Sequence, residues 1–365
     1  MASINDFIAS KKVILDTGPS GANISTPCPL FPQLIEISAS VLGWDSKSIT
    51  AFFGRAGDNG KRVQFYESGR VIPLSYECEL FDPAAQIAIY WVKTDMIAQA
   101  LNHVWVAFGN DPNGTNQDNP ADVWSNGFVY VNHLQEASGD QLDSVNGLHL
   151  VNQANVQQNQ TGYIGKCNNY PNNNTAYSDT AHNSVLDCTT AVSMSLWGNI
   201  SASQISILMQ KATGTDTFNY RMLIGIAAPS GYCLRFRWND SGGGKTISSG
   251  DISSSLGVWR HLAITGVVNG ANVDGNLYMD GANIKSQSVA SGNFATNTDN
   301  LRVGSDATTN LPPNGLLDEL RISNVARTAD WLKLEYYSML VANGFHGGKY
   351  MTWDFTIWNT ELLEN

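Results

Sequence analysis

The sequence predicts an all-β protein with one short helix near its C-terminal end. Short runs of alternating apolar and polar residues recur along the chain, and Gly, Asn, Asp and Ser separate them, a pattern typical of sandwiches and barrels. Charged residues make up only 15% of the 365 residues, and 33 residues are glycine. This composition suits short strands joined by tight turns.

The predicted strands fall into two groups. The first group comprises residues 12–15, 86–92, 103–108 and 128–131, and the second comprises residues 192–197, 220–226, 233–238, 259–265 and 275–279. Asp280-Gly281 follows the last of these runs as a two-residue hairpin-turn signal. Since one domain usually takes about 100–200 residues, we expect an N-terminal β-sandwich at 1–150, a second sandwich at 151–340 and a tail at 341–365. In the tail, Trp353, Phe355, Ile357 and Trp358 could form one more strand.

One segment, residues 324–337, shows convincing helical spacing. It places Trp331, Leu334 and Tyr337 on one face, with Thr328 as the expected N-cap. A second helical turn is expected at 95–101. The Asn-rich stretches 152–161 and 168–174 are predicted to be loops.

The charge balance excludes some partner classes. The chain has 21 basic and 32 acidic residues and a net charge of -11, which argues against nucleic acid and against electrostatic attachment to a membrane. No apolar run approaches the roughly 20 residues of a membrane helix. The five cysteines are an odd number with no C-x-x-C. Scattered buried thiols are favoured, and a Cys167–Cys188 bridge is the alternative.

Four stretches in the C-terminal half follow one another in a recognisable order. They are Val192–Trp197, Gly257–Ile264, Asn276–Gly281 and Gly315–Arg327. Together they resemble the laminin-G-like, concanavalin A-like jelly roll of bacterial and phage surface proteins. The resemblance implies that the second predicted domain is a jelly-roll sandwich.

The N-terminal part resembles a small β domain of unknown function that often precedes such jelly rolls. The stretches that carry this resemblance are Tyr76–Leu80, Ile89–Val92, Val104–Asn110, Asp122–Trp124, Tyr130–Glu136 and Asp143–Gly147. Phe108 and Asn132 depart from the pattern, where a tyrosine and another aromatic residue are usual. The two resemblances together cover most of the chain.

A catalytic pair of acidic residues is one candidate site, because the concanavalin A-like fold also includes β-glucanases. Such enzymes need two carboxylates about 5–5.5 Å apart, and no Glu-x-Asp-x-x-Glu motif occurs here. Glu77 and Glu79 lie in the other predicted domain and are expected to be structural. Asp318 and Glu319 are adjacent, so on a regular strand they would point to opposite faces. The resemblance implies that one of them meets Arg321 or backbone amides inside the sandwich.

Calcium and sugar sites are the remaining candidates. Related folds often hold calcium on a rim loop through oxygen ligands, so calcium is a candidate ligand although no cofactor is predicted to be required. The candidate donors are Asp179, Asp187, Asp216, Asp306 and Asp318. Sugar rings stack on exposed aromatic side chains, and the candidates are Tyr163, Tyr170, Tyr177 and Trp238. In each case a turn-forming aspartate or a core aromatic is the competing interpretation. His103, His133 and His261 are expected to be structural.

These observations favour a non-enzymatic, surface-displayed binding or structural protein. The residues that follow Met1 show no secretory signal, which suggests a phage virion component such as a decoration, fibre or tail protein. We therefore expect a virion-surface or extracellular location, virion or cell-surface proteins as partners, oligomerisation or assembly, and binding to a glycan. The alternatives are a glycoside hydrolase and a fragment of a secreted bacterial adhesin.

Overall fold

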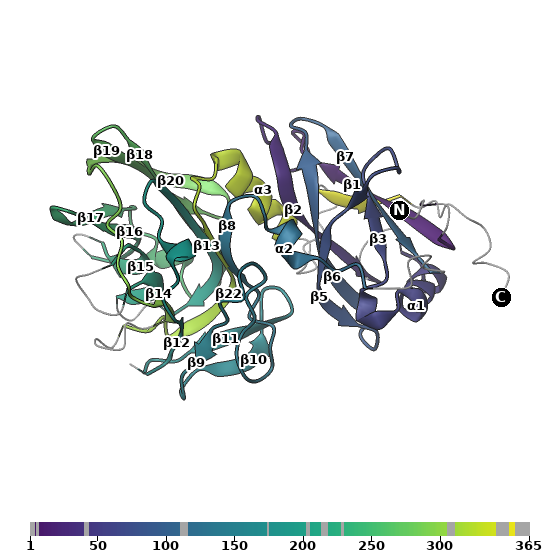
Figure 1. Ribbon diagram of the computed structural model, residues 1–365, viewed down its shortest axis with the longest axis horizontal. Coiled ribbons are helices and arrows are strands. Elements are labelled where there is room, and N and C mark those ends of the chain that lie inside the picture. The colour runs from purple at the N-terminus through teal and green to yellow at the C-terminus, as the bar shows by residue number, and fades with distance from the viewer. Residues whose placement is uncertain are drawn as a thin grey trace. The chain divides into compact units, whose positions relative to one another are not determined.

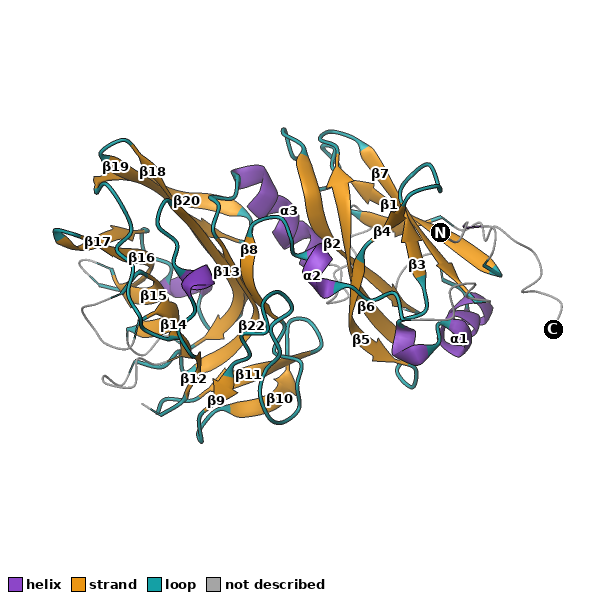
Figure 2. Cartoon of the chain, viewed as in Figure 1, coloured by secondary structure: helices purple, strands orange, loops and turns teal. Residues whose placement is uncertain are grey.

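The structure, a computed structural model, describes residue 4 and residues 7–39, 44–109, 116–173, 175–201, 205–212, 218–227, 230–304, 311–340 and 350–354. Strands dominate it and helices are short (Figure 2), which confirms the all-β prediction. Unit 1 comprises residues 1–126 and 333–365, and unit 2 comprises residues 127–332. The predicted boundaries at 150 and 340 stay predictions, whereas the compact units divide near residues 126 and 332.

Unit 1 contains two antiparallel sheets, so the predicted N-terminal β region is present. The five-stranded sheet has the order β23 (Met351–Trp353), β1 (Ala9–Asp16), β7 (Leu101–Phe108), β3 (Gln64–Tyr66) and β4 (Pro73–Leu74). The three-stranded sheet has the order β2 (Cys28–Ser38), β6 (Ile87–Met96) and β5 (Tyr76–Asp82). β23 confirms a strand in the predicted tail, while Phe355, Ile357 and Trp358 lie outside the described residues.

The two longer α-helices among the described residues each begin after a residue whose side chain caps them. In α1 (Ser46–Arg55), Asp45 accepts hydrogen bonds from the backbone N–H of Lys47 and Ser48, which satisfies two donors that a helix start leaves open. In α3 (Ala329–Leu340), the Thr328 Oγ1 accepts the N–H of Trp331, so the predicted N-cap is confirmed. The unit boundary falls within α3. α2 is a single turn (Pro120–Val123).

Two ionisable side chains are buried in unit 1 with incomplete hydrogen bonding. Lys11 is 1% exposed, and its Nζ has no hydrogen-bond partner among the described residues, although it lies 5.1 Å from the ring centroid of Trp44. Burial lowers the pKa of Lys11. The Glu36 Oε1 accepts from the hydroxyl of Ser38, while its Oε2 meets no partner in the described part of the chain. Burial raises the pKa of Glu36 to about 7.

Unit 2 is built from two larger antiparallel sheets (Figure 1). The eight-stranded sheet has the order β10 (Gln157–Thr161), β11 (Lys166–Tyr170), β22 (Gly315–Ser323), β13 (Ala191–Ile200), β18 (Trp259–Asn269), β19 (Asn272–Met279) and β20 (Ala282–Ala290), and β8 (Phe128–Asn132) also pairs with β22. The seven-stranded sheet has the order β17 (Gly243–Ser248), β16 (Tyr232–Asp240), β15 (Tyr220–Ile226), β14 (Ser206–Lys211), β21 (Leu301–Gly304), β12 (Tyr177–Thr180) and β9 (Val151–Asn152).

The core of unit 2 lies between these sheets. Leu196 and Ile264 from the eight-stranded sheet and Met222 and Phe236 from the seven-stranded sheet belong to one buried hydrophobic cluster. In the central strands alternate residues enter this cluster, as Val192, Met194 and Leu196 of β13 do, which is what the period of two requires. The second predicted sandwich is therefore confirmed.

The Asp280-Gly281 turn also forms as predicted. Asp280 has φ of 52° and Gly281 has φ of 73°, and the flanking residues Met279 and Ala282 pair across the hairpin. Two successive positive φ angles are what a type I′ turn needs, and Gly adopts them at little cost.

Two sequence-based predictions are wrong. Residues 95–101 form no helical turn, because β6 runs to Met96, β7 starts at Leu101, and the Asn102 Oδ1 holds the N–H of Ile97 between them. The Asn-rich stretches 152–161 and 168–174 contain β10 and the end of β11 rather than only loops. The favoured prediction for the cysteines is confirmed, because none of the five forms a disulfide and four of them are buried, so the alternative Cys167–Cys188 bridge is not formed.

Candidate functional site

Three of the four aromatic side chains predicted to contact sugar are buried. Trp238 and Tyr170 are fully buried, where the Trp238 indole donates to the Ser291 hydroxyl and the Tyr170 hydroxyl contacts the Ser178 hydroxyl. Tyr163 is 7% exposed, and its ring stacks on Trp197 with centroids 3.4 Å apart. The expectation that these three rings are exposed is wrong, because a sandwich interior takes large rings wherever they complete its packing.

Tyr177 is half-buried on β12, and its role in binding stays a prediction. The guanidinium carbon of Arg302 lies 4.2 Å from the centroid of its ring. This cation–π contact places the Tyr177 ring next to Arg302 on the seven-stranded sheet.

The candidate calcium ligands Asp179 and Asp187 each pair with a basic side chain. The Asp179 Oδ2 lies 2.9 Å from the Arg302 Nη2, and the Asp187 Oδ1 lies 2.9 Å from the Nζ of the fully buried Lys211. A calcium ion at either carboxylate would compete with these contacts. Asp216 and Asp306 lie outside the described residues. Calcium binding stays a prediction.

Glu77 and Glu79 have structural contacts in unit 1. The Trp124 indole N–H donates to the Glu77 Oε2, and the Trp91 indole N–H donates to the Glu79 Oε2 at 2.6 Å. The two indole rings are buried and pack against each other. These carboxylates therefore anchor tryptophans of the unit 1 core.

Asp318, Glu319, Arg321 and His133 form a buried group that we call the carboxylate cluster. The Asp318 side chain accepts the backbone N–H of Ile164 and of Glu319, each at 2.9 Å. The Glu319 carboxylate contacts the Arg321 Nη2 at 2.7 Å and the His133 Nδ1 at 2.9 Å. The implied contacts of Asp318 and Glu319 with Arg321 and with backbone amides are both present.

The expectation that Asp318 and Glu319 point to opposite faces is wrong. Glu319 has φ of 55°, and the pairing of β22 with β13 shifts register at this point. Asp318 pairs with Trp197 and Arg321 pairs with Ser195, and residues two apart on β13 share a face. Glu319 is thus the extra residue of a β-bulge, which breaks the alternation.

Two of the histidines are buried, and burial keeps two of the thiols protonated. His261 is fully buried against Trp197, and His133 belongs to the carboxylate cluster. Burial raises the pKa of the Cys78 and Cys188 thiols to about 12. A thiol that stays protonated is a poor nucleophile.

One group in unit 2 that the sequence did not reveal is a row of polar side chains across the seven-stranded sheet. Cross-strand register aligns one residue from each of five adjacent strands, and we call this set the arginine row: Asp179, Arg302, Gln210, Arg221 and Arg237. Directly paired residues share a face of the sheet. Their strand neighbours Met209, Met222 and Phe236 enter the core, so the arginine row lies on the face away from it.

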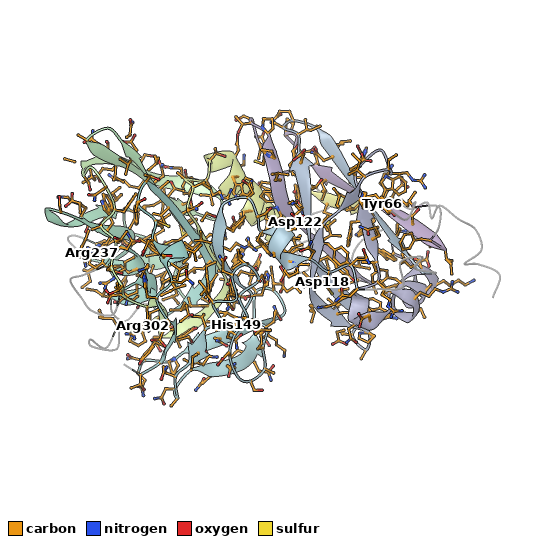
Figure 3. The ribbon with its side chains drawn as sticks, viewed as in Figure 1. Tyr66, Asp118, Asp122, His149, Arg237 and Arg302 are labelled. Atoms are coloured by element: carbon orange, nitrogen blue, oxygen red, sulfur yellow. The ribbon has the colours of Figure 1, made fainter. Side chains whose placement is uncertain are left out.

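Aromatic side chains support the arginine row from one side. The guanidinium carbons of Arg221 and Arg237 lie 4.5 and 4.9 Å from the ring centroid of Phe218. Arg221 is 2% exposed, Arg302 is 6% exposed and Gln210 is fully buried. Arg237 and Arg302 are labelled in Figure 3, on the strands of the seven-stranded sheet.

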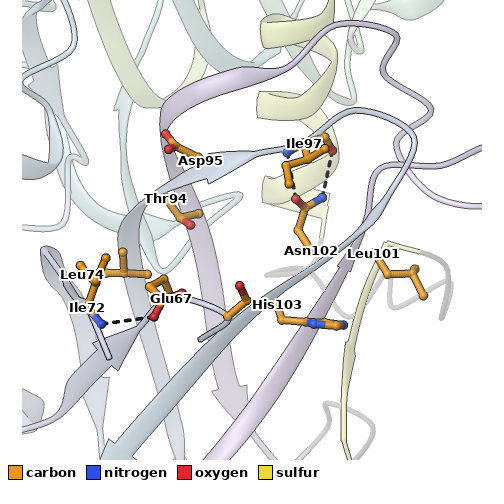
Figure 4. Close-up of a pocket in the computed structure, with 10 residues that line it drawn as sticks. Glu67, Ile72, Leu74, Thr94, Asp95, Ile97, Leu101, Asn102 and His103 are labelled. Carbon is orange, nitrogen blue, oxygen red and sulfur yellow. Dashed lines mark hydrogen bonds between the residues drawn. The ribbon is translucent and has the colours of Figure 1, made fainter. Parts of the chain in front are cut away.

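Unit 1 has a pocket of about 460 Å³ of its own (Figure 4). Ile72, Ile97 and Leu101 line it and are more than half exposed. Glu67 and His103 add polar groups, but the Glu67 carboxylate already accepts backbone N–H groups of the loop that follows it. The pocket thus has a mixed lining of apolar and polar side chains, with the Glu67 carboxylate already engaged.

Residues 172–333 match the Laminin_G_3 family model, described as the concanavalin A-like lectin/glucanases superfamily. The predicted resemblance of this region is therefore confirmed. No curated protein sequence matches the chain significantly.

Solved structures give distant similarities. The binding domain of Paraclostridial Mosquitocidal Protein 1 is 18% identical, with a TM-score of 0.47 over 58% of this chain and 52% of that chain. The receptor-binding domain of the botulinum neurotoxin C/D mosaic serotype is 15% identical, with a TM-score of 0.45 over 57% of this chain and 51% of that chain. The chain thus spans about half the length of these structures.

Proposed function

We propose that unit 2 is a non-catalytic carbohydrate-binding module. The superfamily whose model matches residues 172–333 contains both lectins and glucanases, and the contacts of the carboxylates favour the first of these alternatives. Retaining glucanases need one carboxylate that is free to attack the sugar and a second carboxyl group that protonates the leaving glycosidic oxygen. Asp318 is held by two backbone amides, and Glu319 is held by Arg321 and His133. This engagement of the cluster is the observation that carries the proposal.

Binding is tested on a glycan array with the full chain, with calcium and with a chelator. We expect a subset of glycans to bind. Dependence on calcium would add Asp179 or Asp187 as ligands, and binding in chelator would exclude calcium. Silence across the array from a correctly folded protein would overturn the proposal.

Catalysis is tested separately by release of reducing sugar from β-glucans. We expect no release by the full chain above a heat-denatured sample. Release that Glu319→Gln abolishes, with the fold retained, would establish the hydrolase alternative instead.

We also propose that the protein is displayed on a phage virion or a cell surface, joined to other proteins of that surface. The resemblance of the N-terminal region to a β domain that precedes jelly rolls in such proteins supports this location. No helix among the described residues is long and apolar enough to span a bilayer. Mass spectrometry of purified particles should detect the chain in stoichiometric amounts, and its recovery from a culture supernatant without lysis would favour the secreted adhesin.

A further inference from the structure

Gln210 is the central residue of the arginine row and the one whose side chain is unexplained by the fold. It is fully buried, and neither its Nε2 nor its Oε1 meets a hydrogen-bond partner among the described residues. Leaving a buried donor and acceptor unpaired is costly, and a native structure rarely does so without an unseen water or ligand. The position is on the face of the sheet away from the core, so packing in the core does not require a glutamine there.

The neighbours of Gln210 define what would pair with it. Arg302 and Arg221 lie directly opposite it on the two adjacent strands, and Arg237 follows one strand further. These guanidinium groups are planar donors suited to carboxylate oxygens. The row carries three positive charges and one negative charge, in a chain whose net charge is -11. The net positive charge of the arginine row therefore favours an anionic ligand.

The amide of Gln210 narrows the ligand further. Its Nε2 requires an acceptor and its Oε1 requires a donor. Sulfate and fully ionised phosphate offer acceptors only, so they would leave the Oε1 unpaired. A sugar acid offers carboxylate oxygens for the guanidinium groups and neighbouring hydroxyls that both donate and accept.

We propose that the arginine row binds the carboxylate and an adjacent hydroxyl of an acidic saccharide. Arg221 and Arg237 hold the carboxylate, the amide of Gln210 pairs with the hydroxyl, and the rings of Phe218 and Tyr177 fix the guanidinium planes from the side. This inference rests on the proposed carbohydrate binding by unit 2 and assigns it a ligand class.

The binding test uses an oligogalacturonate and its methyl ester, which is the same sugar chain without its charge, together with inorganic sulfate. Isothermal titration of the full chain should show the acid binding at least about tenfold more tightly than the ester, since charge-assisted hydrogen bonds are lost in the ester. Sulfate should compete weakly. Equal binding of acid and ester, or sulfate binding as tightly as the acid, would overturn the proposal.

Gln210→Met tests the role of the amide through the thermal midpoint of the ligand-free protein. This midpoint should rise if the amide serves a ligand and fall if the amide stabilises the fold. The variant keeps the side-chain volume and removes two unpaired polar atoms. We expect it to lose about tenfold in affinity for the oligogalacturonate while the ligand-free thermal midpoint rises by about 2–4 °C. A lower midpoint would show that Gln210 is satisfied in the folded protein, and the proposal would fail.

Arg235→Lys is the matched control, because Arg235 lies on the same strand as Arg237, two residues away, and donates to the carbonyl of Ile226. It should leave oligogalacturonate affinity within twofold. If neutral glycans bind and Gln210→Met leaves all binding unchanged, the carbohydrate-binding function stands and the acidic specificity is wrong. If no saccharide binds at all, the proposed function fails with it.

Discussion

The two sheets of unit 2 each carry a buried polar group, and the two groups differ in how completely they are hydrogen-bonded. In the carboxylate cluster, Glu319 contacts both Arg321 and His133, and Asp318 accepts two backbone amides. In the arginine row, both polar atoms of Gln210 lack a partner in the described part of the chain. Similar burial thus accompanies paired carboxylates in one group and an unpaired amide in the other. The first group, complete at its two carboxylates, is explained as structure, whereas the unpaired amide points to something that binds.

The largest effect should come from breaking the complete group. Glu319→Ala leaves Arg321 buried without its carboxylate, and we expect the free energy of unfolding of unit 2 to fall by about 3–5 kcal/mol. Chemical denaturation followed by tryptophan fluorescence measures this loss. The exposed Asp140→Ala should change it by less than about 0.5 kcal/mol. A loss below about 1 kcal/mol for Glu319→Ala would mean that the cluster does not stabilise the fold.

Glu36 extends the comparison to an incompletely bonded carboxylate in unit 1. Its pKa is about 7 in the fold against an ordinary value of 4.5. Because the folded state favours the protonated form of Glu36, the free energy of unfolding of unit 1 is highest below pH 4.5. It falls as the pH rises toward 7, by at most about 3 kcal/mol. Glu36→Gln should abolish this loss, as urea denaturation at pH 5 and pH 8 would show. An unchanged pH slope in the variant would contradict the assignment.

Lys11 is the cationic counterpart of Glu36. Removing its buried ammonium with Lys11→Met should raise the stability of unit 1 at pH 7 by about 1–3 kcal/mol. Since burial lowers the pKa of Lys11, the wild type itself gains stability as the pH rises toward 10.5, and the advantage of the variant shrinks. Lys12→Met is the control, because Lys12 is partly exposed and pairs with Asp354. Destabilisation by Lys11→Met would show that the ammonium has a partner in solution.

The smallest effect should come from a single satisfied cap. Thr328→Ala removes the acceptor for the N–H of Trp331 at the start of α3, and we expect a loss of about 1 kcal/mol. Thr328→Ser keeps the hydroxyl and should recover most of the stability in the same thermal unfolding experiment. Equal losses in both variants would place the contribution of Thr328 in its methyl group rather than in the cap.

Local patterns in the sequence predicted much of the fold. Alternation marked strands such as β13 and β18, and Asp280-Gly281 marked its turn, because both signals act between neighbouring residues. α1 was missed, although Asp45 followed by Ser48 is a recognisable capping signal. The Asn-rich strand β11 was missed because pairing with β22 overrides its weak strand propensity.

The candidate site was much harder to predict. Gln210 and Arg302 meet only through the register of β14 with β21, and no local spacing reveals that pairing. The bulge at Glu319 likewise depends on a positive φ in a residue that seldom adopts one. Exposed aromatic residues were sought as sugar contacts, but burial of Trp238 and Tyr170 is decided by the packing of the whole sandwich.

The pairing of β1 with β23, in which Val13 lies opposite Trp353, has a consequence for synthesis on the ribosome. Unit 1 needs a strand that is translated after all of unit 2. The second unit can therefore finish folding while the first still has an open sheet edge, the reverse of the usual N-terminal-first order. Nascent chains should become resistant to protease in residues 127–332 before they do so in residues 7–109. Any chaperone that covers the waiting edge would be needed only until the last strand emerges.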